Sequence, residues 1–469
     1  MTHPPARAER LMHHVLPLAV LVVGLGLVAW SVLAPPPVQP RRVPDMDQRP
    51  PPSAGVGVDL RGSFTAGSGK PAPAGEDWPA FRGPDGDNVS REGIALATDW
   101  GAAGPRKRWS IACGFGYAAP AVAGGRVFLA DYDVERQQDA LRCLSLADGA
   151  EIWRRAYPMV CKFNHGMSRT VPAVADGTVV SIGPRCHVLA CDAATGDFRW
   201  GIDLVRTYGS KEPPWYAGQC PLIDRGRVIL APAGGEVLLM AVDLASGTPA
   251  WTTPNPRKLA MSHSSVLCAT IDGQRQYIYP AMTGIVAVAA EDGRLLWEYS
   301  GWKVTIAWVP TPVQAGPDLV LFAGGYNAGA LMLKVAHSDG VWRAEPAWTL
   351  PAREFGSDQQ TPIVHQGAIF GVIPDGQMVC LGLDGKRRWA SGRADRFGIG
   401  PYVIADGKLL IVNDTGLFTV AEASTTAWKR LAQAQVLDGH DSWGPIAVAG
   451  GAVLVRDLDT LTCLDLGKP

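Results

Sequence analysis

Short apolar runs separated by turn-forming residues make up most of the chain beyond residue 107. The clearest example lies between residues 170 and 200, where Asp176-Gly177 and Gly183-Pro184 interrupt the apolar runs. Glycine accepts the positive φ that a tight hairpin requires, so these dipeptides indicate chain reversals. The pattern predicts four consecutive antiparallel strands, at residues 170–174, 178–182, 188–191 and 198–202.

Tryptophan recurs along the chain at steps of 39 to 51 residues. The eight repeated tryptophans are Trp109, Trp153, Trp200, Trp251, Trp297, Trp348, Trp389 and Trp428. Five of them follow a similar phrase whose last glycine stands four residues earlier, and it is clearest at residues 190–200 and 241–251. We expect each indole to be buried between neighbouring sheets, with its N–H free to find an acceptor.

One four-stranded sheet cannot cover both of its own faces, so each repeat needs its neighbours to complete a core. A period of this length, rich in short strands, is typical of radial repetition. The sequence therefore predicts an all-β fold, an eight-bladed β-propeller of four-stranded antiparallel blades.

The ends of the repeat array fit together. Eight short segments mark the predicted beginning of the inner strand of each blade. They are residues 118–120, 170–172, 219–221, 264–266, 310–312, 360–362, 399–401 and 443–445. The last repeat has no tryptophan after it, whereas Trp109 has no repeat before it. We expect the strand around Trp109 to complete the eighth blade and close the ring, which removes an exposed sheet edge.

The nine cysteines contain no adjacent pair and no C-x-x-C. Cys143, Cys380 and Cys463 fall at one repeat position, which alanine fills in three other repeats. This equivalence favours a small buried site over a disulfide. The net charge of −1 gives no basic excess, so a nucleic-acid partner is not expected.

The N-terminal region predicts a membrane anchor. Residues 15–34 form an apolar stretch long enough to span a bilayer, after a short cytoplasmic tail at residues 1–14. A cleaved signal peptide is the alternative. Residues 35–76 are rich in proline and glycine and are predicted to be a linker, and residues 77–469 to be the propeller. We therefore expect single-pass attachment to the cytoplasmic membrane, with the propeller on the periplasmic side.

The repeated phrase at residues 190–200 and 241–251 resembles the tryptophan-docking motif of the pyrroloquinoline-quinone-like (quinoprotein-type) propeller family. The leader Asp-Trp-Pro-Ala-Phe-Arg-Gly-Pro at residues 77–84 resembles that of a large bacterial subfamily. The resemblance covers about residues 77–469 and implies the fold, which hosts quinoprotein alcohol and sugar dehydrogenases as well as a non-enzymatic outer-membrane assembly lipoprotein.

An alcohol dehydrogenase of that family is expected to carry a disulfide of adjacent cysteines, a calcium or lanthanide ion and an aspartate base. This chain has no adjacent cysteines, although sugar dehydrogenases lack them too. Arg169 and Lys162 are the cations that we would assign to the quinone carboxylates. Residues 85–88 resemble a calcium loop only superficially and are read as a turn, so no metal site and no catalytic residue is predicted.

The segments that lead into the inner strands carry polar and aromatic residues, and a ligand site in the central channel would be formed there. The candidates are Lys162, His165, Arg169, Trp215, Tyr216, His263, Trp308, Gln359, Gln360, His440, Asp441 and Trp443. The alternative is that they only fill or rim a solvated channel.

Three functions follow from these observations. The first is a binding or scaffolding module of the cell envelope, without a cofactor, whose partner is an envelope protein or a polymer. The second is a quinoprotein oxidoreductase that uses pyrroloquinoline quinone (PQQ) with calcium. The third is carbohydrate binding through the channel tryptophans. The missing cysteine pair and the absence of a haem motif favour the first.

Overall fold

The computed structural model describes residues 18, 20–26, 57–161 and 166–468. The chain divides into two units, residues 1–43 and 44–469, and the fold described below belongs to the second. Most of the predicted anchor at 15–34 lies outside the described residues. Within the described part, no helix is both long enough and apolar enough to cross a membrane.

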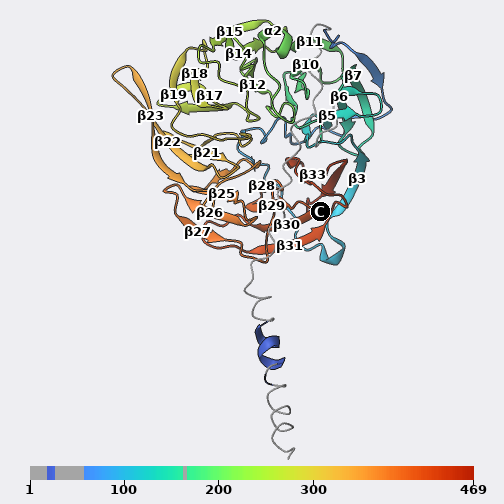
Figure 1. Cartoon of the computed structure of the whole chain (residues 1–469). Helices are drawn as coiled ribbons and strands as arrows, with labels where there is room; N and C mark the ends of the chain where they lie inside the picture. The colour runs from blue at the N-terminus through green and yellow to red at the C-terminus, as the bar shows by residue number, and fades with distance from the viewer. Residues whose placement is uncertain (1–17, 19, 27–56, 162–165, 469) are drawn as a thin grey trace, which may run out of the picture. The chain divides into compact units, whose positions relative to one another are not determined.

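Eight antiparallel sheets follow one another along the chain, which confirms the predicted eight-bladed propeller (Figure 1). Blade 1 contains β4 (Ala121–Ala123), β5 (Arg126–Asp133), β6 (Gln138–Ser145) and β7 (Glu151–Pro158). Blade 2 contains β8 (Ala173–Ala175), β9 (Thr178–Ile182), β10 (His187–Asp192) and β11 (Phe198–Asp203). Blade 3 contains β12 (Leu222–Asp224), β13 (Arg227–Leu230), β14 (Val237–Asp243) and β15 (Pro249–Pro254). Blade 4 contains β16 (Leu267–Ile271), β17 (Gln274–Ala281), β18 (Gly284–Ala289) and β19 (Leu295–Tyr299).

The second half of the ring repeats this plan, and its inner strands continue the series. Blade 5 contains β20 (Val313–Gln314), β21 (Leu319–Gly324), β22 (Gly329–Ser338) and β23 (Val341–Leu350). Blade 6 contains β24 (Ile363–His365), β25 (Ala368–Val372), β26 (Met378–Gly382) and β27 (Arg387–Ala390). Blade 7 contains β28 (Tyr402–Ala405), β29 (Lys408–Val412), β30 (Leu417–Glu422) and β31 (Arg430–Gln435). Blade 8 contains β32 (Ala447–Ala449), β33 (Ala452–Arg456), β34 (Thr460–Asp465) and β3 (Arg106–Ala112).

Ring closure follows the prediction. Strand β3, from the N-terminal side of the array, pairs antiparallel with β34 as the outer strand of blade 8, and Trp109 lies opposite Cys463. Cys143 and Cys380 likewise lie opposite Trp153 and Trp389 on neighbouring strands. All three thiols are fully buried, and all nine cysteines are free, which confirms the small buried position that the repeat predicts.

The inner strand of blade 2 begins later than predicted. The sequence predicts it at 170–174, whereas β8 starts at Ala173. Pro172 has no N–H to donate to the sheet. The residues before it bond elsewhere, since the Thr170 hydroxyl donates to the Ile182 carbonyl and the Val171 N–H donates to the Cys220 sulfur of the next blade.

The repeated indoles join one blade to the next. A methyl group added at Gly196 of blade 2 would lie 2.6 Å from the ring of Trp153 in blade 1. A methyl group added at Gly247 of blade 3 would likewise lie 2.6 Å from the ring of Trp200 in blade 2. Both glycines have a positive φ, near 75° and 72°. The indole N–H then donates to a backbone carbonyl in the turn it covers. The donor and acceptor pairs are Trp109 with Leu146, Trp153 with Ala193, Trp200 with Leu244, Trp348 with Leu383 and Trp389 with Ser424.

Three of the eight tryptophans depart from this rule. Trp297 donates to Gln276 within its own blade. Trp428 precedes β31 and turns back to Asp395, between blades 6 and 7. The Trp251 N–H has no hydrogen-bond partner in the described part of the chain, although its ring still covers the turn glycine Gly293.

Part of the predicted linker belongs to the propeller. Strand β1 (Ser63–Ala66) pairs with β7 and adds a fifth strand to blade 1. Leu60 is buried in the core between blades 1 and 2, and Arg155 donates to the Arg61 carbonyl. The linker predicted at 35–76 is therefore wrong for these residues, because backbone pairing and a few apolar contacts outweigh a turn-rich composition.

Other segments before β3 fasten to the ring. Strand β2 (Val89–Ser90) pairs in parallel with β28 on the inner edge of blade 7. A short 3-10 helix, η1 (Gly101–Ala103), precedes β3. The described helix within the blades, α2 (Leu204–Tyr208), follows β11, and Asp203 caps its first turn by accepting the Arg206 N–H.

A matched pair of glycine substitutions separates indole docking from backbone strain. Gly247 and Gly226 both have φ near 72° in blade 3, but only Gly247 lies under an indole. Gly226→Ala should cost about 1 kcal/mol of folding free energy through its positive φ. Gly247→Ala should cost about 3 kcal/mol, because the new methyl group also displaces Trp200. Chemical denaturation measures both, and equal losses would contradict the docking role.

Candidate functional site

The segments that lead into the inner strands gather at one end of the ring, here called the mouth. A belt of hydrogen bonds links them from blade to blade. In each link a backbone N–H donates to the side chain of the equivalent residue in the next blade. The links run from Val171 to Cys220, from Cys220 to Ser265, from Ser265 to Thr311 and from Thr311 to Thr361. The belt fixes the register of blades 2 to 6 around the channel.

Four predicted residues come together at the mouth, joined by a fifth that was not predicted. We call Tyr117, Arg169, Trp215, His263 and Trp443 the mouth cluster. The Arg169 guanidinium lies 5.1 Å from the centre of the Tyr117 ring. The centre of the Trp443 ring also lies 5.1 Å from the centre of the Tyr117 ring. A cation near the face of an aromatic ring is attracted to its π-electrons.

The cluster continues into the next blades. Arg169 donates from Nε to the Trp215 carbonyl at 2.5 Å, and the Trp215 and His263 rings lie 6.1 Å apart. His263 Nε2 lies 2.5 Å from the Pro214 carbonyl, so this nitrogen carries the proton. Trp215 and Tyr216 both have positive φ, near 62° and 74°, which is uncommon for bulky residues and places their rings by strain as well as packing.

Asp414 supports the opposite end of the cluster. Its Oδ1 accepts the Trp443 indole N–H at 2.8 Å and the Ile399 N–H at 2.9 Å. Burial raises the pKa of Asp414 above the ordinary carboxyl value. The carboxylate therefore orients Trp443 between blades 7 and 8.

The remaining predicted residues are not part of this cluster. Trp308 is fully buried in an apolar core, edge-on to Trp302 and Phe322, so its ring is not available at the channel. Gln360 braces blade 7 by donating to the carbonyls of Gly398 and Gly400.

The other candidates divide into rim and interior residues. His440 is exposed at the rim, with Nδ1 3.4 Å from the carboxylate of the buried Asp441. Gln359 is half-buried, whereas Tyr216 packs in the core between blades 1 and 2. Lys162 and His165 lie outside the described residues.

Two residues of the site escaped the sequence analysis. Tyr117 immediately precedes the inner-strand start at 118–120, so the rule that selected the other candidates would also have selected it. Asp414 stands in the turn between β29 and β30, far along the chain from the residues that it orients. Nothing in its local sequence marks it.

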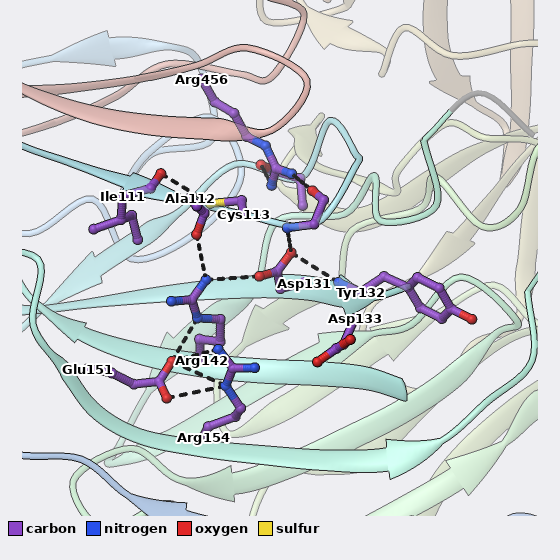
Figure 2. A network of polar contacts seen from close by, with 12 residues as sticks. Ile111, Ala112, Cys113, Asp131, Tyr132, Asp133, Arg142, Glu151, Arg154 and Arg456 are labelled. Carbon is purple, nitrogen blue, oxygen red and sulfur yellow. Dashed lines mark hydrogen bonds and ion pairs between the residues drawn. The ribbon is translucent and has the colours of Figure 1, made fainter. Parts of the chain in front are cut away.

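Buried arginines hold the segment that carries Tyr117 (Figure 2). Arg456 of blade 8 is 1% exposed and donates to the carbonyls of Gly114 and Ala118 at 2.6 and 2.9 Å. Arg142 of blade 1 donates to the Ala112 carbonyl and to Asp131, at 3.1 and 2.9 Å. The two guanidinium groups thus bind both sides of the seam at which the ring closes.

Carboxylates complete this seam network. Asp131 accepts the backbone N–H groups of Gly114 and Tyr132 with its second oxygen, and Glu151 pairs with Arg142 and Arg154. Each buried charge therefore has several partners, which offsets the cost of removing it from water. The groups that join the two sides of the seam therefore also hold the segment on which Tyr117 lies.

A second buried polar group lies between blades 1 and 2. The Tyr157 hydroxyl donates to Asp139 Oδ2 at 2.5 Å, and the His187 ring packs edge-on against Tyr157. Burial raises the pKa of Asp139 to about 7, although the Tyr157 hydrogen bond opposes this shift. Burial also lowers the pKa of His187 to about 4, so the imidazole is neutral at neutral pH.

The raised pKa of Asp139 predicts a stability change with pH. The folded protein keeps a proton that the unfolded carboxyl releases near pH 4, so this contribution to stability is full below about pH 4 and is lost as the pH rises through about 7. Asp139→Asn removes the titration. We expect this variant to melt several degrees above the parent protein at pH 8.5, with the difference shrinking towards pH 4. The exposed Asp339→Asn is the control, and a pH-independent difference would contradict the assignment.

The described residues do not match the donor set of a quinone–calcium pair. Among them, no group of three or more His, Cys, Asp or Glu side chains is placed to hold a metal ion. Arg169 is engaged with Tyr117 and Trp215, and Trp308 has no accessible face on which a flat cofactor could stack. We therefore derive no redox step at this site.

Comparison with solved structures finds the same fold at low sequence identity. BamB from Moraxella catarrhalis is 13% identical over 77% of this chain and all of its own, with a TM-score of 0.55. The quinohemoprotein alcohol dehydrogenase ADHIIG from Pseudomonas putida HK5 is 12% identical, and that of Comamonas testosteroni 13%. Each covers 84% of this chain and 81% of its own, with a TM-score of 0.55. At such identities the likeness shows the fold alone.

Sequence comparison gives the family. No curated protein matches the chain. The profile described as outer membrane protein assembly factor BamB, of the PQQ-like repeat type, matches residues 136–391, which is more than half of the sequence. The chain therefore belongs to the BamB family of PQQ-like β-propellers.

Proposed function

We propose that this protein is a binding or scaffolding propeller of the cell envelope, anchored to the cytoplasmic membrane by residues 15–34 with its blades on the periplasmic side. Its partner is an envelope protein or an envelope polymer. Family membership supports this role, since the matching family is described as an outer membrane protein assembly factor. The apolar stretch in the sequence supports the anchor.

The observation that carries the proposal is the composition of the mouth. Arg169 and Trp443 are partly exposed there, beside the exposed His440. Arginine, tryptophan and tyrosine are the residues that most often dominate the binding energy of protein interfaces. Here they sit together at one end of the ring, where the lead-in segments of several blades contribute to a single surface.

The surface is also held rigid before any partner arrives. Arg456 fixes the segment that carries Tyr117, and Asp414 orients the Trp443 indole. The belt fixes the neighbouring lead-in segments. A preorganised surface loses less conformational entropy on binding, which raises affinity without additional contacts.

Site-specific photo-cross-linking in intact cells tests this role. A photoreactive amino acid at His440 should give an adduct with one envelope component, whereas the same group at the exposed Arg225, in the turn between β12 and β13, should not. Combining the change with Arg169→Ala and Trp443→Ala should reduce the adduct about tenfold or more, because both anchors are lost. Equal yields from His440 and Arg225 would contradict a docking role for the mouth.

The membrane anchor has its own test. Deleting residues 1–34 should move the protein from the membrane pellet to the soluble fraction after alkaline extraction, because the apolar stretch is removed. The propeller should keep its melting temperature. Persistence of the shortened protein in the pellet would contradict the anchor.

The alternative is a quinoprotein oxidoreductase, favoured by the fold shared with the two quinohemoprotein dehydrogenases. Titration of the purified protein with PQQ and calcium separates the two roles. The scaffolding proposal expects no saturable binding at micromolar quinone and no dye reduction. Saturable binding with dye reduction would establish the alternative instead.

A further inference from the structure

The leader at residues 77–84 lies along the inner strands of the first blades. Trp78 exchanges backbone hydrogen bonds with Val122 of blade 1, and the Pro79 carbonyl accepts the Val174 N–H of blade 2. The chain then passes to β2 on the inner edge of blade 7. Phe81 packs against a small apolar cluster from blades 1 to 3, formed by Ala119, Ala121 and the belt residues Val171 and Cys220.

The next residue, Arg82, is buried without matching acceptors. Arg82 is only 3% exposed. Nε and Nη2 are both buried, and neither has a hydrogen-bond partner in the described part of the chain. These two nitrogens form one edge of the guanidinium, and their N–H bonds point in parallel. That edge is the one that binds both oxygens of a carboxylate or phosphate at once.

Neighbouring groups do not supply the missing acceptor. The charge of Asp87 favours the protonated form of Arg82, but its oxygens accept from the Val89 N–H at 3.0 Å and from Arg91 at 2.6 Å. Tyr402, which also influences Arg82, has a buried hydroxyl without a partner. Arg82 and Tyr402 therefore both carry buried polar atoms without a partner in the described part of the chain.

The energetic cost of this arrangement is high. Burial lowers the pKa of Arg82 only to about 10, so the side chain remains charged at neutral pH. A buried charge without a partner is strongly destabilising. Arg82 also has φ near 68°, a strained conformation for a residue with a side chain. Such costs persist where a ligand offsets them.

We propose that the leader forms a binding site for a small oxyanion, held by the Nε and Nη2 edge of Arg82 with the Tyr402 hydroxyl as a further donor. The ligand chemistry is a carboxylate or a phosphate. None of these residues belongs to the mouth cluster, and the inference does not rest on the proposed function.

Calorimetric titration of the full-length protein tests the site, after exhaustive dialysis against a buffer without oxyanions. Sodium phosphate and sodium acetate are the two probes, at constant ionic strength, with sodium chloride as the salt control. We expect saturable binding of one stoichiometric equivalent. Phosphate binding alone would identify a tetrahedral anion, and acetate binding alone a carboxylate.

Arg82→Lys keeps the buried charge but loses the two-donor edge, so it should weaken binding about tenfold or more. Arg257→Lys, at an exposed arginine paired with Glu298, is the matched control and should bind as the parent protein does. Equal affinity of the Arg82→Lys variant and the parent, or no saturable binding of either anion, would overturn the proposal.

A measurement on the unsubstituted protein covers the case in which Arg82→Lys does not fold. Crystals grown with selenate should show an anomalous peak within hydrogen-bond distance of Nε and Nη2 of Arg82. Selenate stands in for phosphate, and bromoacetate in separate crystals stands in for acetate; the absence of an anomalous peak there with both anions would also overturn the proposal.

Discussion

The contact between an indole and the turn glycine of the next blade, made by five of the eight repeated tryptophans, is the interaction on which the ring depends. A sheet of four short strands has little core of its own, so its stability comes from the faces it shares with its neighbours. Because glycine has no side chain, the turn of one blade leaves room for the indole of the preceding blade, as Gly247 does for Trp200. The glycine and the indole that contacts it belong to adjacent repeats. The same repeated sequence motif therefore specifies both the local turn and the packing between blades.

One group of buried charges lies where blade 8 is completed by two distant parts of the chain. The four blade-forming strands are consecutive in sequence in seven of the eight blades, but blade 8 combines the two ends of the array. At that junction the structure places Arg456, Arg142 and Asp131, which bind backbone groups that have no repeat partner. The mouth cluster begins directly beside this junction. Closure of the ring and organisation of the surface that we assign to binding are therefore coupled.

The sequence predicts the periodic features and fails on the others. The blade number, the closing strand and the buried cysteine position follow from spacing alone, because each recurs at a fixed place in the repeat. Direction of a side chain does not follow from spacing: Trp308 has the position of a channel residue, yet it lies in the core. Contacts such as those of Asp414 with Trp443, and the pairing of β1 with blade 1, join segments with no common pattern.

The path of the leader has one last consequence. The segment from Trp78 to β2 pairs with blades 1 and 2 and with blade 7, which stand on the two sides of blade 8. Separating the two chain segments that form blade 8 would therefore require these contacts to break as well as the pairing of β3 with β34.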